Sequence, residues 1–248
     1  MTPLLRVERM TKTFDALVAN REVSFQVNQG DLFGIIGPNG AGKTTLFNCI
    51  AGRYAPTSGR IFFDNRDVTS LSAHQMARLG LARTFQVYAA SGDLTVLENV
   101  MVGCFLRTRS RFKARQRASE ILEEFGLADL ADTLLVEVPV AYQKLVTAAT
   151  AVATRPKLLL LDEVAAGLNP TEVEQIMAMI RHINQNRGIT VILIEHVMTL
   201  VMNLCHRIMV LDSGEKIAEG PPEEVAALPA VIKAYLGERY VQTQLGGQ

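Results

Sequence analysis

Eight consecutive residues have the composition and spacing of a phosphate-binding loop, and a threonine follows them. The segment consists of Gly37, Pro38, Asn39, Gly40, Ala41, Gly42, Lys43, Thr44 and the following Thr45. Its first eight residues fit the pattern G-x-x-x-x-G-K-[ST] between a strand-like run and a predicted helix, which disfavours an ordinary glycine turn. Exposed N–H groups of such a loop attract anions. Lys43 would reach the β- and γ-phosphates of a nucleotide, and the Thr44 hydroxyl would ligate Mg²⁺.

Two carboxylates follow an apolar run in the second half of the chain. Residues 158–161 are all leucine, and Asp162 and Glu163 come directly after them. At the carboxyl end of a buried strand, both acids would lie beside the phosphate loop of a doubly wound fold. Asp162 would hold Mg²⁺ through water, and Glu163 would orient and deprotonate an attacking water. Without the phosphate loop, such a pair would be interpreted as a solvated turn.

A histidine lies just beyond a third apolar run. His196 follows residues 190–194, which are rich in Ile and Val, with one residue between. At the same edge of the sheet, His196 could reach the γ-phosphate and respond to its presence. A lone histidine is more often structural, and His74, His182 and His206 have no comparable context. We assign those three no role.

The elements that must position these groups follow from the apolar pattern. Near-continuous apolar runs typical of a parallel sheet buried on both faces lie at 31–36, 60–63, 157–161, 190–194 and 207–211. Residues 4–9 and 22–27 alternate and predict an antiparallel flank. Helical patterns replace the strand signal at 94–106, 111–125 and 141–153.

The fold class predicted from this pattern is α/β, with a mostly parallel sheet core, an antiparallel β flank and an inserted helical subdomain. Residues 1–248 would form a single domain. Its catalytic core would comprise 1–86 and 156–248, and its helical subdomain 87–155.

Composition limits the partners of the chain. Lysine plus arginine and aspartate plus glutamate each total 25, so no net field draws the protein to nucleic acid. The spacing of Cys49, Cys104 and Cys205 fits neither a metal site nor a redox pair, which favours a reducing compartment. No apolar run approaches the roughly 18 residues of a membrane span, and the start lacks a signal-peptide pattern. We expect a soluble chain that would serve a membrane only through other subunits.

Taken together, these motifs resemble the nucleotide-binding subunits of ABC transporters over nearly the whole chain. The resemblance implies a P-loop ATPase fold with ATP and Mg²⁺ as cofactors. Gln86 matches the glutamine that touches Mg²⁺ and links the core to the helical subdomain in that family. Phe14 occupies the place of the aromatic residue that stacks on adenine, although it could equally be a core residue.

Within this family, the sequence is most similar to the ATPases of importers for branched-chain amino acids and related small solutes. The segments that carry this likeness are 80–86, 94–100, 165–170 and 234–237. The resemblance implies a second ATPase subunit, two integral-membrane permease subunits, an extracytoplasmic solute-binding protein and no nucleic acid. The chain would then lie on the cytoplasmic face of the membrane. Alternatives are an ATPase for urea or amides, an exporter motor, a non-transport ABC protein and a regulator that hydrolyses nothing.

The sequence departs from the family in its signature loop. This loop, whose backbone caps the γ-phosphate bound to the opposite subunit, falls on residues 138–142. Ala141 replaces a glycine and Tyr142 replaces a glutamine, and an added Cβ should weaken the cap. One hypothesis is that only one of two composite sites turns over. The alternative is that the helix N-terminus still supplies enough donors.

One basic segment remains outside these motifs. Six of the eleven residues at 107–117 are Arg or Lys. Such a run is usually a solvated helical face. The other interpretation is contact with anionic lipid headgroups or with acidic loops of a permease.

Overall fold

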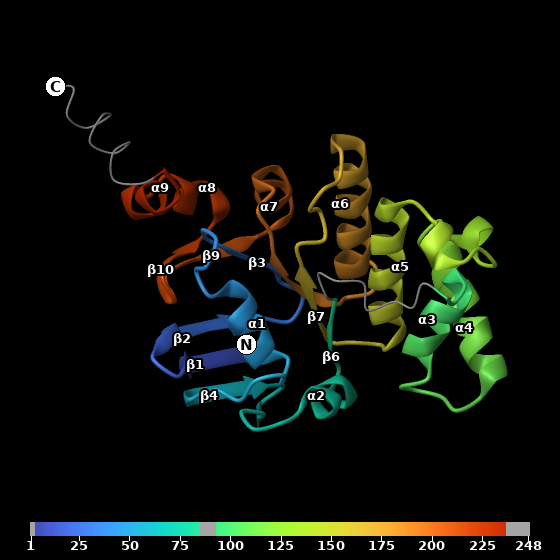
Figure 1. The fold of residues 1–248 in the computed structure, drawn as a ribbon, viewed down its shortest axis with the longest axis horizontal. Helices are drawn as coiled ribbons and strands as arrows, with labels where there is room; N and C mark the ends of the chain where they lie inside the picture. The colour runs from blue at the N-terminus through green and yellow to red at the C-terminus, as the bar shows by residue number, and fades with distance from the viewer. Residues whose placement is uncertain (1–2, 85–92, 237–248) are drawn as a thin grey trace. The chain divides into compact units, whose positions relative to one another are not determined.

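The computed structural model describes residues 3–84 and 93–236 (Figure 1). The chain divides into two compact units, the first formed by Met1–Ala73 with Ile192–Gln248 and the second by His74–Val191. The predicted division into a core and a helical subdomain at 87–155 stays a prediction. Gln86 lies outside the described residues.

A four-stranded antiparallel sheet forms one part of the first unit. Its order is β2-β1-β4-β5, and its strands are β1 (Leu5–Phe14), β2 (Leu17–Val27), β4 (Ser58–Phe63) and β5 (Arg66–Asp67). On β1, Val7 pairs with Phe25 on one side and Ile61 on the other, and all three side chains are buried. The predicted antiparallel flank is therefore confirmed. Residues 60–63, predicted as a strand of the parallel sheet, lie instead in β4 of this antiparallel sheet, because they pair with β1. Both strands of the β1–β2 hairpin extend further than the alternating pattern indicated.

The first unit also contains strands of a second sheet, which has six strands in the described part of the chain. The five-residue strand β3 (Leu32–Ile36) is buried throughout and runs parallel to β9 (Arg207–Asp212), which pairs antiparallel with β10 (Glu215–Gly220). Strand β8 (Thr190–Ile194) carries the chain across the boundary between the units. No strand was predicted at β10, because its first two residues are exposed and the other four only half-buried, which leaves no apolar run. The helices of this unit are α1 (Lys43–Ile50), α7 (Met198–Leu204), α8 (Pro222–Ala226) and α9 (Pro229–Leu236).

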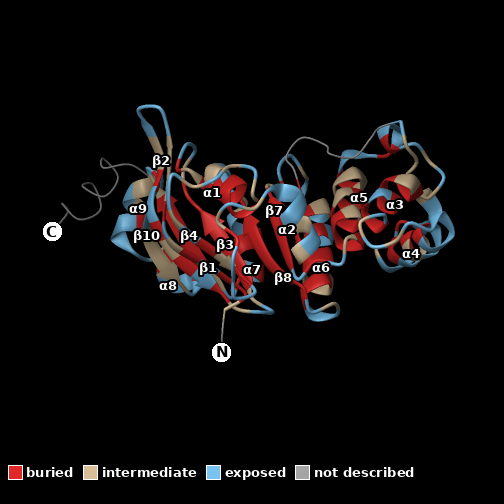
Figure 2. Cartoon of the chain, turned by 90° about the horizontal axis from the view of Figure 1, so that it is seen from below, coloured by how far each residue is buried: buried red, intermediate tan, exposed pale blue. Residues whose placement is uncertain are grey.

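The second unit combines a pair of parallel strands with helices. The strands β6 (Leu81–Arg83) and β7 (Leu158–Asp162) pair in parallel, with Leu81 opposite Leu158. The α-helices are α2 (Ala73–Leu79), which begins at the unit boundary, α3 (Val96–Cys104), α4 (Arg111–Glu124), α5 (Val140–Ala153) and α6 (Pro170–Gln185). Two short 3₁₀ turns lie at Ala128–Leu130 and Leu135–Glu137. Figure 2 shows β7 buried along its length, whereas much of α4 is exposed.

Local sequence signals account for where these helices begin and how they pack. Thr95 and Glu98 form a capping box at the start of α3, and Asn169 and Glu172 form another at α6. Gly103 lies where a Cβ would stand 2.1 Å from the Thr150 carbonyl oxygen of α5. A side chain there would push α3 and α5 apart. No described helix has the length and apolarity required of a membrane span.

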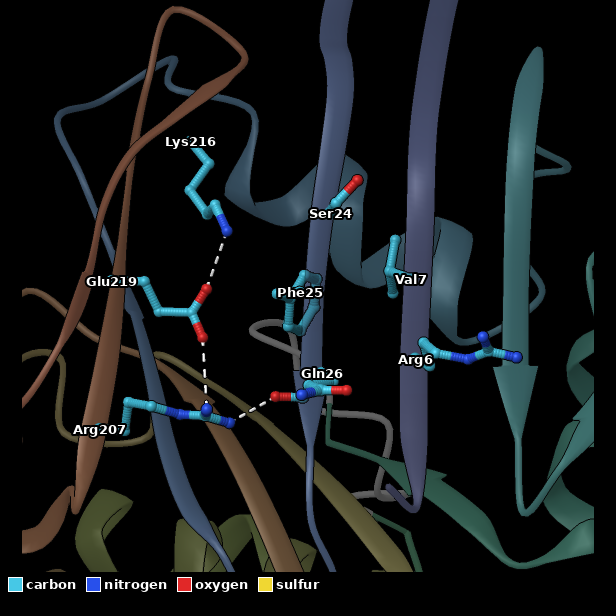
Figure 3. A pocket seen from close by; sticks show the side chains of 8 residues that line it. All are labelled: Arg6, Val7, Ser24, Phe25, Gln26, Arg207, Lys216 and Glu219. Carbon is cyan, nitrogen blue, oxygen red and sulfur yellow. Dashed lines mark hydrogen bonds and ion pairs between the residues drawn. The ribbon is translucent and has the colours of Figure 1, made fainter. Parts of the chain in front are cut away.

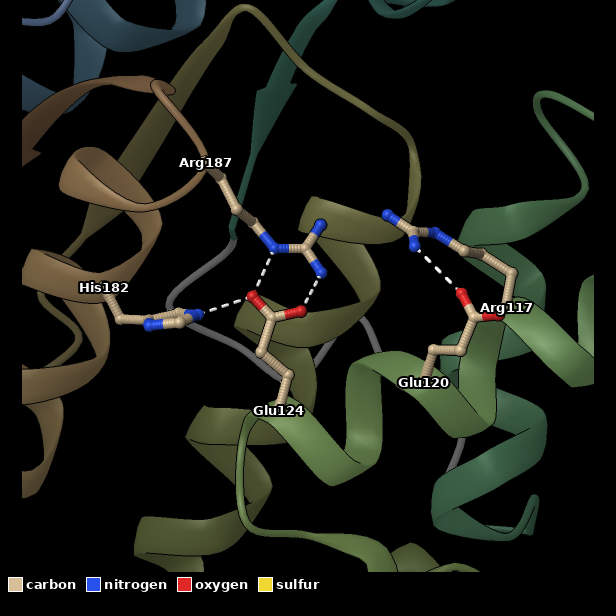
Figure 4. Close-up of polar contacts among 5 residues, drawn as sticks. All are labelled: Arg117, Glu120, Glu124, His182 and Arg187. Carbon is tan, nitrogen blue, oxygen red and sulfur yellow. Dashed lines mark hydrogen bonds and ion pairs between the residues drawn. The ribbon is translucent and has the colours of Figure 1, made fainter.

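A polar cluster joins α4 to α6 and to the turn that follows α6 (Figure 4). The Glu124 carboxylate accepts hydrogen bonds from Arg187, one of them from Nε at 2.6 Å, and lies 2.5 Å from Nε2 of His182. The Arg187 contact, followed by that of His182, lowers the pKa of Glu124 from 4.5 to about 2, against the opposing effect of burial. His182, which had no assigned role, therefore contributes to this structural link.

Candidate active site

The phosphate loop joins β3 to α1 in the first unit, and close packing requires its glycines. A Cβ at Gly37 would lie 2.1 Å from the Leu211 carbonyl oxygen, and one at Gly42 would lie 2.3 Å from that of Ala19. Both residues also have positive φ, at 151° and 93°, as does Gly40 at 81°. The backbone can follow this path only where side chains are absent.

The Lys43 side chain folds back onto the first residues of the phosphate loop. Its side-chain ammonium donates to the carbonyl oxygens of Gly37, at 2.8 Å, and Pro38, at 2.9 Å. The residue is only 6% exposed, so these carbonyls replace part of the water that the charge would otherwise bind. Thr44, the next residue of α1, is exposed and Thr45 is half-buried. The ammonium and the Thr44 hydroxyl are thus both available at the loop to a phosphate chain and its cation.

Two residues that the sequence analysis did not single out hold the loop in place. Asn20 of β2 is fully buried, and its Nδ2 donates to the Gly42 carbonyl oxygen at 3.2 Å. The backbone N–H of Gly214, in the turn between β9 and β10, donates to the Ala41 carbonyl oxygen at 3.2 Å. No local pattern could have revealed these supports, since both partners lie far from the loop in the sequence.

The last described helix also reaches the loop. Burial raises the pKa of the Tyr235 phenol above its usual value, and a hydrogen bond with the backbone of Gly37 opposes part of that rise. Tyr235 lies on α9, within the segment 234–237 that carried part of the family resemblance. The Tyr235 phenol of α9 therefore lies near the first residue of the phosphate loop.

Phe14 and His196 lie in the same unit as the loop. The Phe14 ring is 39% exposed and meets the edge of Tyr54 at a centroid distance of 5.4 Å. Nζ of Lys12 lies 4.9 Å from the Phe14 ring centroid. A ring this exposed is not a core residue, which leaves its stacking on adenine as the prediction to test. His196 is exposed, and its backbone N–H donates to the carboxylate of the buried Glu195 at 3.3 Å.

In the second unit, the buried carboxylate at the end of β7 has an arginine partner. Nη2 of Arg83 lies 2.6 Å from Oδ2 of Asp162, and the two side chains are 6% and 1% exposed. The Asp162 N–H donates to the Thr84 hydroxyl at 3.3 Å. Because a buried carboxylate without a counter-charge is costly, Arg83 supplies the counter-charge that Asp162 requires. Sequence reasoning missed Arg83, although it lies three residues before Gln86.

Glu163 adopts a backbone conformation that few side chains tolerate. Its φ is 50°, in the left-handed region, and its carbonyl oxygen accepts a hydrogen bond from the Ala166 N–H at 3.2 Å. Such a conformation costs on the order of 1 kcal/mol for a residue with a Cβ, and such strain is concentrated at functional sites. The turn directs the chain away from β7 while the carboxylate stays half-exposed.

The predicted signature loop lies at the start of α5. Pro139 is the N-cap residue and makes no side-chain capping bond, so the first N–H groups of the helix have no side-chain acceptor there. Ala141 is 4% exposed, whereas Val140 is 50% exposed. The Ala141 methyl group is therefore packed into its own unit. Nε2 of Gln143 donates to the Val138 carbonyl oxygen at 2.6 Å, which closes the preceding turn.

The first unit also contains a separate pocket of about 320 Å³, in which a carboxylate pairs with the neighbouring cations (Figure 3). It is lined by Arg6, Val7, Ser24, Phe25, Gln26, Arg207, Lys216 and Glu219. Glu219 lies 2.9 Å from Nζ of Lys216 and 3.5 Å from Nη1 of Arg207, and Arg207 also donates to the Gln26 carbonyl oxygen. Since its cations already have partners, we assign this pocket a structural role.

These parts define an ATP-binding cassette ATPase. The family model described as ABC transporter matches residues 20–166, and the model described as branched-chain amino acid ATP-binding cassette transporter matches residues 215–241. The chain belongs to the ABC transporter family, as the sequence motifs indicated. Nucleotide binding and ATPase activity follow from that membership.

Named relatives and solved structures resemble the chain over nearly their full length. The branched-chain amino acid transport ATP-binding protein BraF of Pseudomonas aeruginosa is 39% identical over 95% of this chain and 98% of its own length. LivG of Escherichia coli K12 is 38% identical over the same shares. A solved nucleotide-free cassette of an ABC transporter is 33% identical with a TM-score of 0.88, and covers 96% of this chain and 100% of its own. The predicted fold class is thus confirmed.

Proposed function

We propose that this chain hydrolyses ATP to drive an importer of branched-chain amino acids or related small solutes. The observation that carries the proposal is the phosphate loop with its buried lysine, in a chain that is 39% identical to a branched-chain amino acid transport ATPase. A match at residues 215–241 to a model of such transporters supports the same solute class. A lipopolysaccharide export ATPase is also similar, but at 33% identity. Import is therefore the favoured direction.

Each predicted site residue has a separate proposed role in ATP binding or hydrolysis. Lys43 would exchange its carbonyl contacts at Gly37 and Pro38 for the β- and γ-phosphates. Phe14 would stack on the adenine, and His196 would contact the γ-phosphate. Glu163 would take a proton from the attacking water, since a half-exposed carboxylate at a strained turn can accept one.

Mg²⁺ is the proposed second cofactor, and the donor set fits it. Magnesium usually takes one or two protein oxygens and several waters, together with substrate phosphates. The exposed Thr44 hydroxyl, the Asp162 carboxylate and Gln86 are the residues that would hold it. When bound, it would neutralise charge that develops on the phosphates.

The partners would be a second ATPase subunit, two integral-membrane permease subunits and, indirectly, an extracytoplasmic solute-binding protein. The chain would then lie on the cytoplasmic face of the membrane. The altered signature loop supports a different ATPase chain as the second subunit, because Ala141 and Tyr142 stand where a glycine and a glutamine are usual.

The test is ATP hydrolysis by the purified chain, alone and mixed with candidate second subunits. We expect Glu163→Gln to retain ATP binding and to lower turnover by about 10²-fold or more, since it removes the general base. Glu174→Gln, an exposed position on α6, is the matched control and should behave like the wild type. Equal turnover in Glu163→Gln and the control would refute the proposed role. Leucine uptake by vesicles with the assembled transporter tests the solute class, and uptake of urea alone would refute it.

A further inference from the structure

The second unit contains a pocket with four basic residues in its lining. It has a volume of about 230 Å³ and is lined by Cys104, Arg107, Thr108, Lys113, Arg117, Ala153 and Arg155. Four of these seven residues are cationic and none is a carboxylate. The pocket of Figure 3 holds an acid that neutralises its cations, and this one does not. We call it the basic pocket.

One of the four cations has a structural role. Nε of Arg107 donates to the Thr154 carbonyl oxygen at 2.7 Å, and its two other nitrogens donate to the carbonyl oxygens of Arg78, at 3.2 Å, and Ala77, at 3.3 Å. These carbonyls belong to the C-terminal ends of α5 and α2, where a cation is favourable. Arg107 is thus explained by the fold alone.

The other three cations are not explained in this way. No hydrogen bond or ion pair of the Lys113 or Arg155 side chain occurs within the described part of the chain. Arg117 pairs with Glu120 at 3.0 Å (Figure 4), but its buried Nε has no acceptor among the described residues. Against a single carboxylate, these three side chains leave a net positive charge at the pocket.

The positions of these cations oppose the local backbone preferences. Lys113 lies in the first turn of α4, a turn that has no acidic residue, and a cation there is unfavourable to the helix dipole. Arg155 has a φ of 54° just after α5, at a position where glycine is the usual residue. Lys113 therefore costs stability unless an anion compensates its charge, whereas the cost at Arg155 is steric and does not depend on its charge.

We propose that the basic pocket binds a small phosphate-bearing anion, either free in solution or as the headgroup of a lipid. Ammonium and guanidinium groups around one cavity match the charge and the oxygens of a phosphate. The Thr108 hydroxyl, which accepts from the Ser110 N–H at 3.2 Å, still has its own proton to donate. The volume is below the roughly 300–1,000 Å³ of pockets for drug-sized ligands, which fits a phosphate or diphosphate group.

The buried floor of the pocket is consistent with this charge. Cys104 is 2% exposed, and burial raises the pKa of its thiol, while Arg117 and Arg155 oppose that rise. Both guanidinium groups therefore act on the same small volume, as binding of a single anion requires.

The test compares two double variants of the full chain that remove equal charge. Lys113→Gln with Arg155→Gln removes the two cations of the pocket whose side chains make no hydrogen bond or ion pair with the described residues. Arg109→Gln with Arg115→Gln removes two exposed cations of the same segment that do not line it. Binding of inorganic pyrophosphate is measured by titration calorimetry with the nucleotide site saturated by ADP and Mg²⁺. Binding to phosphatidylglycerol vesicles is measured by flotation, with phosphatidylcholine vesicles as the blank.

We expect pyrophosphate affinity to fall about tenfold in the pocket variant and less than about twofold in the control, because only the pocket variant removes charge-assisted bonds. Vesicle binding with the same dependence, and without pyrophosphate binding, would assign the anion to a lipid headgroup. Equal losses in both double variants would overturn the proposal, as would no binding in either assay. Thermal unfolding of each variant verifies folding, and ATP hydrolysis is recorded separately, so the outcome does not depend on the proposed function.

Discussion

At the scale of single residues, the acidic end of β7 depends on a partner from another strand. Asp162 and Arg83 are both nearly inaccessible to water, so their charges compensate each other rather than being solvated. Breaking a buried pair by removing one partner costs about 3–5 kcal/mol, because the remaining charge stays buried. Arg83 would therefore position the carboxylate that is proposed to hold Mg²⁺.

Replacing this arginine tests that dependence. We expect Arg83→Met to lower the free energy of unfolding by about 3 kcal/mol in urea titrations without nucleotide. Arg21→Met is the control: its pair with Glu215 has side chains that are 61% and 53% exposed, and its removal should cost less than about 1 kcal/mol. Similar losses in the two variants would show that Asp162 does not rely on Arg83.

At the scale of elements, the phosphate loop is shaped by its neighbours as much as by its own sequence. The β2 strand approaches Gly42 from one side, and the turn after β9 approaches Ala41 from the other. The approach of β2 is too close for a side chain at Gly42, whereas Gly40 faces open space. The two glycines therefore serve the same motif for different physical reasons.

This difference predicts unequal effects of alanine. Gly42→Ala places a Cβ against the Ala19 carbonyl oxygen, and we expect nucleotide affinity to fall by about 10²-fold or more as the loop shifts. Gly40→Ala meets no atom within 4 Å and should cost only about 1 kcal/mol of backbone strain. Equilibrium binding of a fluorescent ATP analogue separates the two, and equal losses would argue against packing as the cause.

The link between α4 and α6 predicts a pH dependence. The pKa of Glu124 is lowered from 4.5 to about 2 in the folded chain, so its ion pair stabilises the fold fully above about pH 4.5. That contribution is lost as the pH falls towards 2, because protonation removes the charge that Arg187 and His182 contact. In urea titrations between pH 5 and about pH 2, Glu124→Gln should flatten the acid loss of stability. Glu120→Gln, in a more exposed single pair, should not.

At the scale of the whole molecule, the question is how the chain completes a site with a second subunit. In the ABC family, the signature loop of each subunit caps the nucleotide of the other. Pro139, the N-cap residue of α5, makes no side-chain capping bond, and the Ala141 methyl group is buried within its own unit. That burial argues against the Ala141 methyl group as the cause of a weakened cap, so the proposal of a different second subunit depends mainly on Tyr142.

Restoring the usual residues tests which interpretation holds. If the altered loop limits turnover, Ala141→Gly with Tyr142→Gln should raise ATP hydrolysis by the chain alone about tenfold. Glycine within a helix costs about 1 kcal/mol, so Ala148→Gly in the same helix controls for lost helix stability. Unchanged turnover in the restored variant would show that the loop tolerates Ala141 and Tyr142.

The sequence by itself determined the phosphate loop, the acidic strand end, the fold class and the family. These features depend on residues that are close in the chain, so a motif or an apolar period reveals them. Only the tertiary structure decided the Asn20 and Gly214 supports, the Arg83–Asp162 pair and the contact of Tyr235 with the loop. The tertiary structure also brings four cations that are separated in the sequence into one pocket: Arg107, Lys113, Arg117 and Arg155. Such contacts join residues far apart in the chain, and their energies depend on burial and distance, which no local pattern records.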